Sequence, residues 1–205
     1  MIEKRVYDAP QLCRQEILRY AGVKEAAPAT EALLEECLRE AKEKLTYRVC
    51  FRMISIEECA AMFPSGALQN TLVGCSSVLV FAATVGADLD RLIARYGSIS
   101  PAKAHMLQAI GAERIEALCD TFCRDMQVST HRFSPGYGDL PLTAQKEIFA
   151  LLEPMKHIGL GLTGSLLMAP TKSVTALAGM GGKALAPTDK CSRCGKLDCD
   201  FRSTL

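Results

Sequence analysis

The sequence of 205 residues contains no tryptophan and three histidines, and aromatic residues make up 6% of it. Its net charge is +1, which argues against a polyanion such as nucleic acid as a partner. The longest apolar run, VLVFAATVGA at 78–87, is far shorter than the roughly 20 residues that span a membrane. The stretch MIEKRVYDAP is charged and has no apolar signal core. We therefore expect a cytoplasmic protein with no membrane partner.

Cysteine, in contrast, is abundant, with ten residues. Seven of them lie in segments with helix or strand patterns, and we expect them to be small core residues in a reducing compartment: Cys13, Cys37, Cys50, Cys59, Cys75, Cys119 and Cys123.

The other three cysteines, Cys191, Cys194 and Cys199, crowd into CSRCGKLDC. The C-x2-C spacing lets two thiolates bind one metal, so this stretch predicts a zinc site or an iron–sulfur cluster. Structural zinc takes four ligands, and the fourth would come from Asp198, Asp200, a distant cysteine or a partner. Reduced thiols without metal are the alternative.

The spacing of apolar residues predicts helices over 8–21, 29–45, 56–63, 100–127 and 142–153, and strands over 46–54, 75–86, 165–170 and 173–180. In the first strand, the side that carries Arg48, Cys50 and Arg52 is expected to face water. We predict one α+β domain over 1–182, with 1–70 as an N-terminal extension, a sheet of four or five strands and packed helices. Residues 183–205 are expected to form a linker and a cysteine-rich tail.

The stretch RFSPGYGDLP at 132–141 is the part of the sequence with the clearest set of candidate ligand-binding groups. An arginine can grip a carboxylate or phosphate through two parallel hydrogen bonds. Pro135 and Gly136 form a turn that lets another molecule approach the backbone, and Tyr137 offers a ring and a hydroxyl. These groups suit a small zwitterion with an aromatic part. An ordinary turn with a solvated arginine is the alternative.

RFSPGYGDLP, together with KHIGLGLTGSLLMAPTKSVTALAGM at 156–180, resembles the activation domain of cobalamin-dependent methionine synthase, which binds S-adenosylmethionine (AdoMet) through an R-x-x-x-G-Y motif. The order Leu-Leu-Glu, Lys-His, Leu-Thr and Pro at 151–153, 156–157, 162–163 and 170 also matches that family. The likeness covers about residues 100–180 and is weaker through 84–93. It implies a twisted, mainly antiparallel sheet with packed helices.

The resemblance also implies a ligand site. Arg132 would bind the AdoMet carboxylate, the backbone of Ser134, Pro135 and Gly136 would line the ligand, and Tyr137 would pack beside it.

The family also uses a helix acid near the cationic methionine part of the ligand. Ala117 stands at that position here, so Glu116 or Glu113 would have to replace the acid.

We therefore expect an AdoMet-binding module that reactivates a corrinoid carried by a separate protein, either a cobalamin-binding protein or a truncated methionine synthase. The chain has no Asp-x-His-x-x-Gly stretch to ligate cobalt, so cobalamin would enter only through the partner, and an electron donor would be needed as well. Because cob(I)alamin is already a strong nucleophile, the protein would supply orientation and no base. The alternatives are a metal-binding interaction subunit that no longer binds AdoMet, and a redox enzyme built on the cysteine tail.

Overall fold

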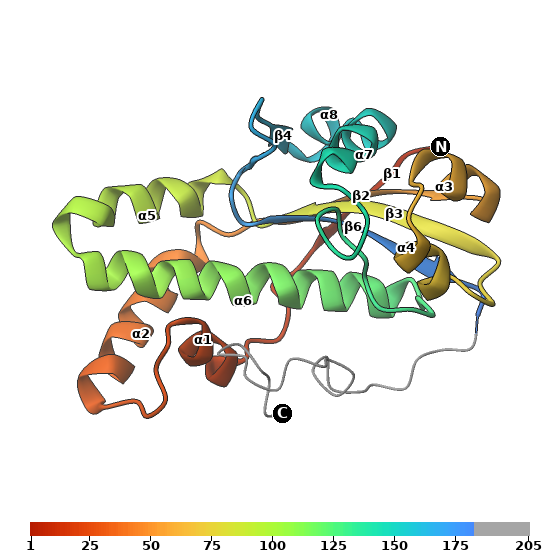
Figure 1. The fold of residues 1–205 in the computed structure, drawn as a ribbon. Helices are drawn as coiled ribbons and strands as arrows, with labels where there is room; N and C mark the ends of the chain where they lie inside the picture. The colour runs from red at the N-terminus through yellow and green to blue at the C-terminus, as the bar shows by residue number, and fades with distance from the viewer. Residues whose placement is uncertain (183–205) are drawn as a thin grey trace.

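The structure, a computed structural model, describes residues 1–182 (Figure 1). Its strands are β1 (Glu3–Tyr7), β2 (Tyr47–Ile54), β3 (Ser77–Thr84), β4 (Gly161–Leu162), β5 (Met168–Ala169) and β6 (Ser173–Met180). Its α-helices are α1 (Arg14–Tyr20), α2 (Pro28–Lys42), α3 (Ile56–Met62), α4 (Gly66–Thr71), α5 (Ala87–Ile99), α6 (Pro101–Asp125), α7 (Gln145–Leu152) and α8 (Pro154–Ile158), and a short 3-10 helix, η1 (Leu142–Ala144), precedes α7.

Four strands form one antiparallel sheet in the order β1-β2-β3-β6, while β4 and β5 pair in a small separate hairpin. The predicted α+β class and the antiparallel sheet are confirmed. Because β1 and β2 supply half of the main sheet, residues 1–70 are an integral part of the domain. The predicted strand over 165–170 is wrong for most of its length, since Met168–Ala169 alone is extended and pairs with β4.

Helices cover both faces of this sheet. One apolar core lies between the sheet and α6, and it includes Phe51, Phe81 and Phe122. A second core on the opposite face includes Val80, Phe63 and Ile148. Figure 1 shows the layers, with α7 and α8 on one side of the sheet and α6, backed by α1 and α2, on the other.

The second core corrects the expectation that one side of β2 faces water. Cys50 is fully buried there, because the layer that contains α3, α7 and α8 covers that face. Arg48 near the start of the strand is exposed, as the alternation predicts.

Helix α6 packs on the main sheet over most of its length, and its bounds confirm the helix predicted over 100–127. Pro101 occupies its first turn, where a missing N–H costs nothing. Gly111 lets neighbours approach closely, because a Cβ there would lie 2.7 Å from the Leu89 side chain and 2.9 Å from that of Lys172. Among the described residues, no helix combines the length and apolarity that crossing a membrane requires.

The described cysteines divide into two groups. Five are buried, as predicted for core residues: Cys37, Cys50, Cys59, Cys119 and Cys123. The core prediction is wrong for Cys13 and Cys75, which are partly exposed. Both lie outside regular elements, where the chain leaves the core: Cys13 just before α1 and Cys75 between α4 and β3.

Candidate ligand site at the edge of the sheet

The segment after α6 follows the open edge of β6. The amide of Ser129 donates to the carbonyl of Gly179 at 2.8 Å. Phe133 and Leu177 exchange two backbone hydrogen bonds, each of 2.8 Å. Successive side chains on an extended segment point to opposite faces. Arg132 therefore points toward α6, whereas Phe133 packs into the core on the other face.

Arg132 binds two carboxylates of α6. Its Nη1 donates to Asp120 Oδ1 at 2.7 Å, and its Nη2 donates to Glu116 Oε2 at 2.5 Å. The arginine side chain is 16% exposed, and those of Glu116 and Asp120 are 37% and 41% exposed. Burial raises the pKa of the adjacent Cys119 thiol, which therefore stays protonated and adds no charge. One cation and two anions thus meet at a surface that solvent reaches.

Asp120 is a member of this cluster that the sequence analysis missed. It follows Glu116 by one helical turn, and residues at that spacing share one face of a helix. The four-residue spacing of Glu116 and Asp120 was the feature of the sequence that could have indicated Asp120 as a second acid. What the sequence alone could not show is that the segment after α6 turns back over this face.

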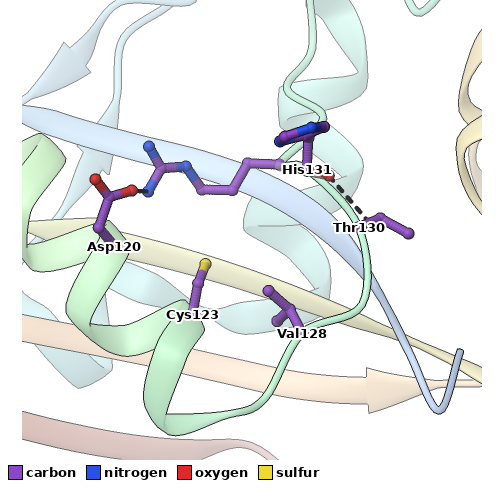
Figure 2. Close-up of a pocket in the computed structure, with 6 residues that line it drawn as sticks. Asp120, Cys123, Val128, Thr130 and His131 are labelled. Carbon is purple, nitrogen blue, oxygen red and sulfur yellow. Dashed lines mark hydrogen bonds and ion pairs between the residues drawn. The ribbon is translucent and has the colours of Figure 1, made fainter. Parts of the chain in front are cut away.

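A hollow of about 340 Å³ lies beside Arg132. It is lined by Asp120, Cys123, Val128, Thr130, His131 and Arg132. Figure 2 shows Asp120 and Cys123 projecting from α6 on one side of the hollow, with Val128, Thr130 and His131 on the segment that follows this helix. The lining combines charged, polar and apolar groups, as a ligand with an ionic end and an apolar body would require.

Residues 134–140 form the tight turn predicted from Pro135 and Gly136. The Tyr137 amide donates to the Ser134 carbonyl at 3.2 Å, and the Gly136 amide donates to Leu140 at 2.9 Å. Gly136 has φ of +91°, a region that side chains disfavour. Pro135 is buried beneath the turn, whereas Tyr137 is 70% exposed. The ring of Tyr137 is therefore presented to solvent, five residues after the arginine, and it does not line the hollow.

Asp139 holds the far end of this turn against α4. Its carboxylate accepts hydrogen bonds from the hydroxyl of Ser65, from the amide of Gly66 at 2.7 Å and from that of Ala67 at 3.2 Å. The bond from Ser65, supported by those backbone amides, lowers the pKa of Asp139. The turn is thus fixed at both ends, by β6 at Phe133 and by α4 at Asp139.

Glu113, the other candidate acid, lies in a different environment. It is 3% exposed, pairs with Arg114 at 2.5 Å and accepts a hydrogen bond of 2.9 Å from the amide of Cys13. Arg114 in turn donates to the carbonyl of Pro10 at 2.7 Å. The structure therefore brings Glu116 to Arg132 and uses Glu113 to hold the N-terminal segment.

The three cysteines of the predicted metal site, Cys191, Cys194 and Cys199, lie outside the described residues. Within residues 1–182, no group of three or more His, Cys, Asp or Glu side chains is arranged to hold a metal ion.

Comparison with known proteins identifies the class of domain to which this arrangement is similar. Residues 111–185 match the family model described as the activation domain of vitamin B12-dependent methionine synthase. The match includes the second half of α6, the turn and β6, so the resemblance noted in the sequence is confirmed. No functionally curated protein matches the chain.

Thirteen solved chains match this one in structure. One of them is the crystal structure of the MetH reactivation domain bound to AdoHcy, with a TM-score of 0.65 and 15% identity. The alignment covers 91% of this chain and 80% of that one. The chain thus has the fold of a methionine synthase reactivation domain, and the N-terminal 70 residues lie largely within the shared fold.

Proposed function

We propose that this chain binds AdoMet at the Arg132 site and presents it to a corrinoid that has lost its methyl-accepting Co(I) state. The observation that carries the proposal is the cluster of Arg132, Glu116 and Asp120 at the hollow, with the glycine turn following Arg132 in the chain. The matching family model and the similar MetH reactivation domain, which was solved bound to AdoHcy, support it.

The cluster suits the amino-acid end of AdoMet. A ligand carboxylate can bind Arg132, because two of the five guanidinium N–H groups serve Asp120 and Glu116, and the rest can serve a ligand. The ligand ammonium can bind the two helix carboxylates, which are each more than a third exposed. The cluster carries a net charge of about −1, so it favours a ligand with a further positive charge. AdoMet has one in its sulfonium.

The remaining groups fit the rest of the ligand. In this proposal the backbone of Ser134, Pro135 and Gly136 lines the ligand, and the exposed ring of Tyr137 packs beside it. AdoMet would supply an electrophilic methyl group on its sulfonium. The protein holds the other parts of the molecule still, which is a contribution of orientation and needs no base.

A corrinoid-binding partner and an electron donor complete this function. We infer that cobalamin is carried by a partner protein, either a corrinoid protein or a truncated methionine synthase. One electron from the donor must first reduce cob(II)alamin to cob(I)alamin. Cob(I)alamin would then take the methyl group as the S–CH3 bond of AdoMet breaks, and S-adenosylhomocysteine would leave. Such a reaction belongs to the cytoplasm, where reduced thiols and AdoMet are available.

Reactivation itself is tested by mixing the chain with AdoMet and a cobalamin-binding domain of methionine synthase in the cob(II)alamin form, with titanium(III) citrate as reductant. The visible spectrum distinguishes cob(II)alamin from methylcobalamin. We expect methylcobalamin to form at a rate that depends on the chain and falls with Arg132→Ala. Equal rates with and without the chain would contradict the proposal.

A second function has one observation in its favour, the three-cysteine motif at 191–199. In this alternative the chain is a metal-binding interaction subunit that does not bind AdoMet. It predicts that Arg132→Ala leaves partner binding unchanged, whereas removing the cysteines abolishes it.

A further inference from the structure

Asp120 and Glu116 both bind Arg132, but they lie differently relative to the hollow. Asp120 belongs to the wall of the hollow, and Figure 2 shows it on the α6 side. Glu116 reaches Arg132 from one helical turn earlier and is not among the residues that line the hollow. A ligand in the hollow therefore has the Asp120 carboxylate as its neighbouring acid.

The formal charges around the hollow do not cancel. Among the described residues that line it, Asp120 and Arg132 carry opposite charges, and Glu116 adds a second negative charge beside the same arginine. Asp125, the next acid along α6, is held by two side chains of β1 and does not line the hollow. The site is thus more favourable to a ligand with a net positive charge than to a neutral one.

The proposed reaction changes the charge of its ligand. AdoMet carries a carboxylate, an ammonium and a sulfonium, so its net charge is positive. When the S–CH3 bond breaks, the bonding electron pair stays on sulfur and the methyl group goes to cobalt. The product, S-adenosylhomocysteine (AdoHcy), keeps the carboxylate and the ammonium but has a neutral thioether. Substrate and product therefore differ by one methyl group and one positive charge.

We propose that Asp120 makes this site select AdoMet over AdoHcy, by attracting the sulfonium charge that the product lacks. The inference rests on the proposed function, because it requires AdoMet to lie in this hollow. It assigns Asp120 as a specificity-determining residue, whereas Arg132 serves the carboxylate that both ligands share. The site holds its ligand less tightly once the methyl group has left, so AdoMet can replace the product.

The size of this preference follows from how open the site is. Two opposite charges about 5 Å apart change an affinity by roughly fourfold in bulk water and by more than about 100-fold at an effective dielectric constant of about 20. The Asp120 side chain is 41% exposed, and Arg132 offsets part of its charge, so the effect lies nearer the lower value. We expect AdoMet to bind about tenfold more tightly than AdoHcy.

Calorimetric titration of the full chain with three ligands tests the charge preference. AdoMet has its sulfonium at the critical position, AdoHcy has a neutral sulfur there, and sinefungin has a carbon that bears an ammonium group. We expect AdoMet and sinefungin to bind wild type about tenfold more tightly than AdoHcy at low salt. Sinefungin that binds no more tightly than AdoHcy would overturn the inference, because the site would then recognise the methyl group and not the charge.

The same titration separates this inference from the proposed function on which it rests. Equal affinities of wild type for AdoMet and AdoHcy would overturn the inference and leave the proposed function standing. No binding of any of the three ligands would overturn both.

The second experiment compares Asp120→Asn with Asp125→Asn, which removes the same charge from the same helix outside the hollow. A structural role of Asp120, such as holding Arg132, would weaken AdoMet and AdoHcy binding alike and leave their ratio unchanged. We expect the preference for AdoMet to fall from about tenfold to about threefold or less in Asp120→Asn, and to stay at the wild-type value in Asp125→Asn. An unchanged ratio in Asp120→Asn, or an equal fall in Asp125→Asn, would refute the assignment.

A measurement on the wild-type chain covers the case in which Asp120→Asn does not fold. Raising the salt concentration from about 20 mM to about 300 mM shortens the screening length from roughly 20 Å to roughly 6 Å. The preference for AdoMet over AdoHcy should then fall at least about twofold, because AdoHcy has no net charge to be screened. A preference of the same size at both salt concentrations would contradict selection by charge.

Discussion

The ion pairs of Arg132 with Glu116 and Asp120 allow a prediction whose magnitude follows from the structure. Two unit charges about 4 Å apart attract by about 4 kcal/mol at an effective dielectric constant of 20. The carboxylates are 37% and 41% exposed, however, so solvent screens much of this energy and replaces the lost contact when one partner is removed. We therefore expect a coupling free energy of about 0.5–1.5 kcal/mol between Arg132 and Asp120, between the values for surface and buried pairs.

A double-mutant cycle measures this coupling. It comprises Arg132→Gln, Asp120→Asn and the double variant, with unfolding by urea followed by circular dichroism, since the chain has no tryptophan. Arg91 and Asp88 form a matched control pair on α5, because they are 76% and 54% exposed. That pair should couple by less than about 0.5 kcal/mol. A coupling for Arg132 and Asp120 no larger than the control would show that the charge cluster does not form in solution.

Three further substitutions test the fold around the site. Gly179→Ala should lower the free energy of unfolding by about 1–3 kcal/mol, because the added methyl group overlaps neighbouring side chains. Gly164 has open space around it, so Gly164→Ala should change the free energy of unfolding by less than about 0.5 kcal/mol. Urea titration compares the two variants, and equal effects would contradict the packing described at Gly179. Asp139→Asn should be less stable than wild type at neutral pH. The difference in stability should shrink as the pH falls below the ordinary Asp pKa of about 3.9 and through the lowered pKa of the folded state, because wild type then loses the same charge. A difference that is constant from pH 7 to pH 2 would refute the role of the carboxylate. Arg114→Met should cost about 3–5 kcal/mol, because it leaves Glu113 buried without its charge partner. Adding Glu113→Leu should recover only part of that loss, because the Cys13 amide and the Pro10 carbonyl also lose their partners. Thermal unfolding of both variants tests this, and full recovery by Glu113→Leu would contradict the role of those backbone contacts.

The longest elements could be predicted from the sequence because their patterns agree with their surroundings. The apolar face of α6 faces one core of the sheet, and its first turn begins at Pro101 as the proline indicates. Strand β6 coincides with the strand predicted over 173–180, and both of its faces are largely buried.

Other elements could not be recognised in this way. Strand β1 has the charged sequence EKRVY because it lies at the edge of the sheet with much of its surface in water, so no apolar alternation marks it. Helix α1 begins at Arg14, later than predicted, because Arg114 and Glu113 hold the preceding segment in an extended path through its backbone.

In the candidate site, too, the sequence indicated some residues and not others. Arg132, Gly136 and Tyr137 stand out in the sequence because they crowd one turn. Asp120 and Asp139 did not, because their roles depend on where α6 and α4 lie relative to that turn. The geometry favours Glu116 over Glu113 as the candidate acid, since the two acids point to different sides of α6 and only Glu116 contacts Arg132.

Titration of the purified chain with AdoMet by calorimetry tests the central claim most directly, with Arg132→Ala and the exposed-arginine control Arg91→Ala in parallel. The account predicts micromolar or tighter binding by wild type and by Arg91→Ala. For Arg132→Ala it predicts affinity weaker by about 10- to 150-fold, the equivalent of a charged hydrogen bond worth 1.5–3 kcal/mol. Equal affinity of Arg132→Ala and wild type, or no binding by wild type at millimolar AdoMet, would contradict the assignment of this turn as the AdoMet site.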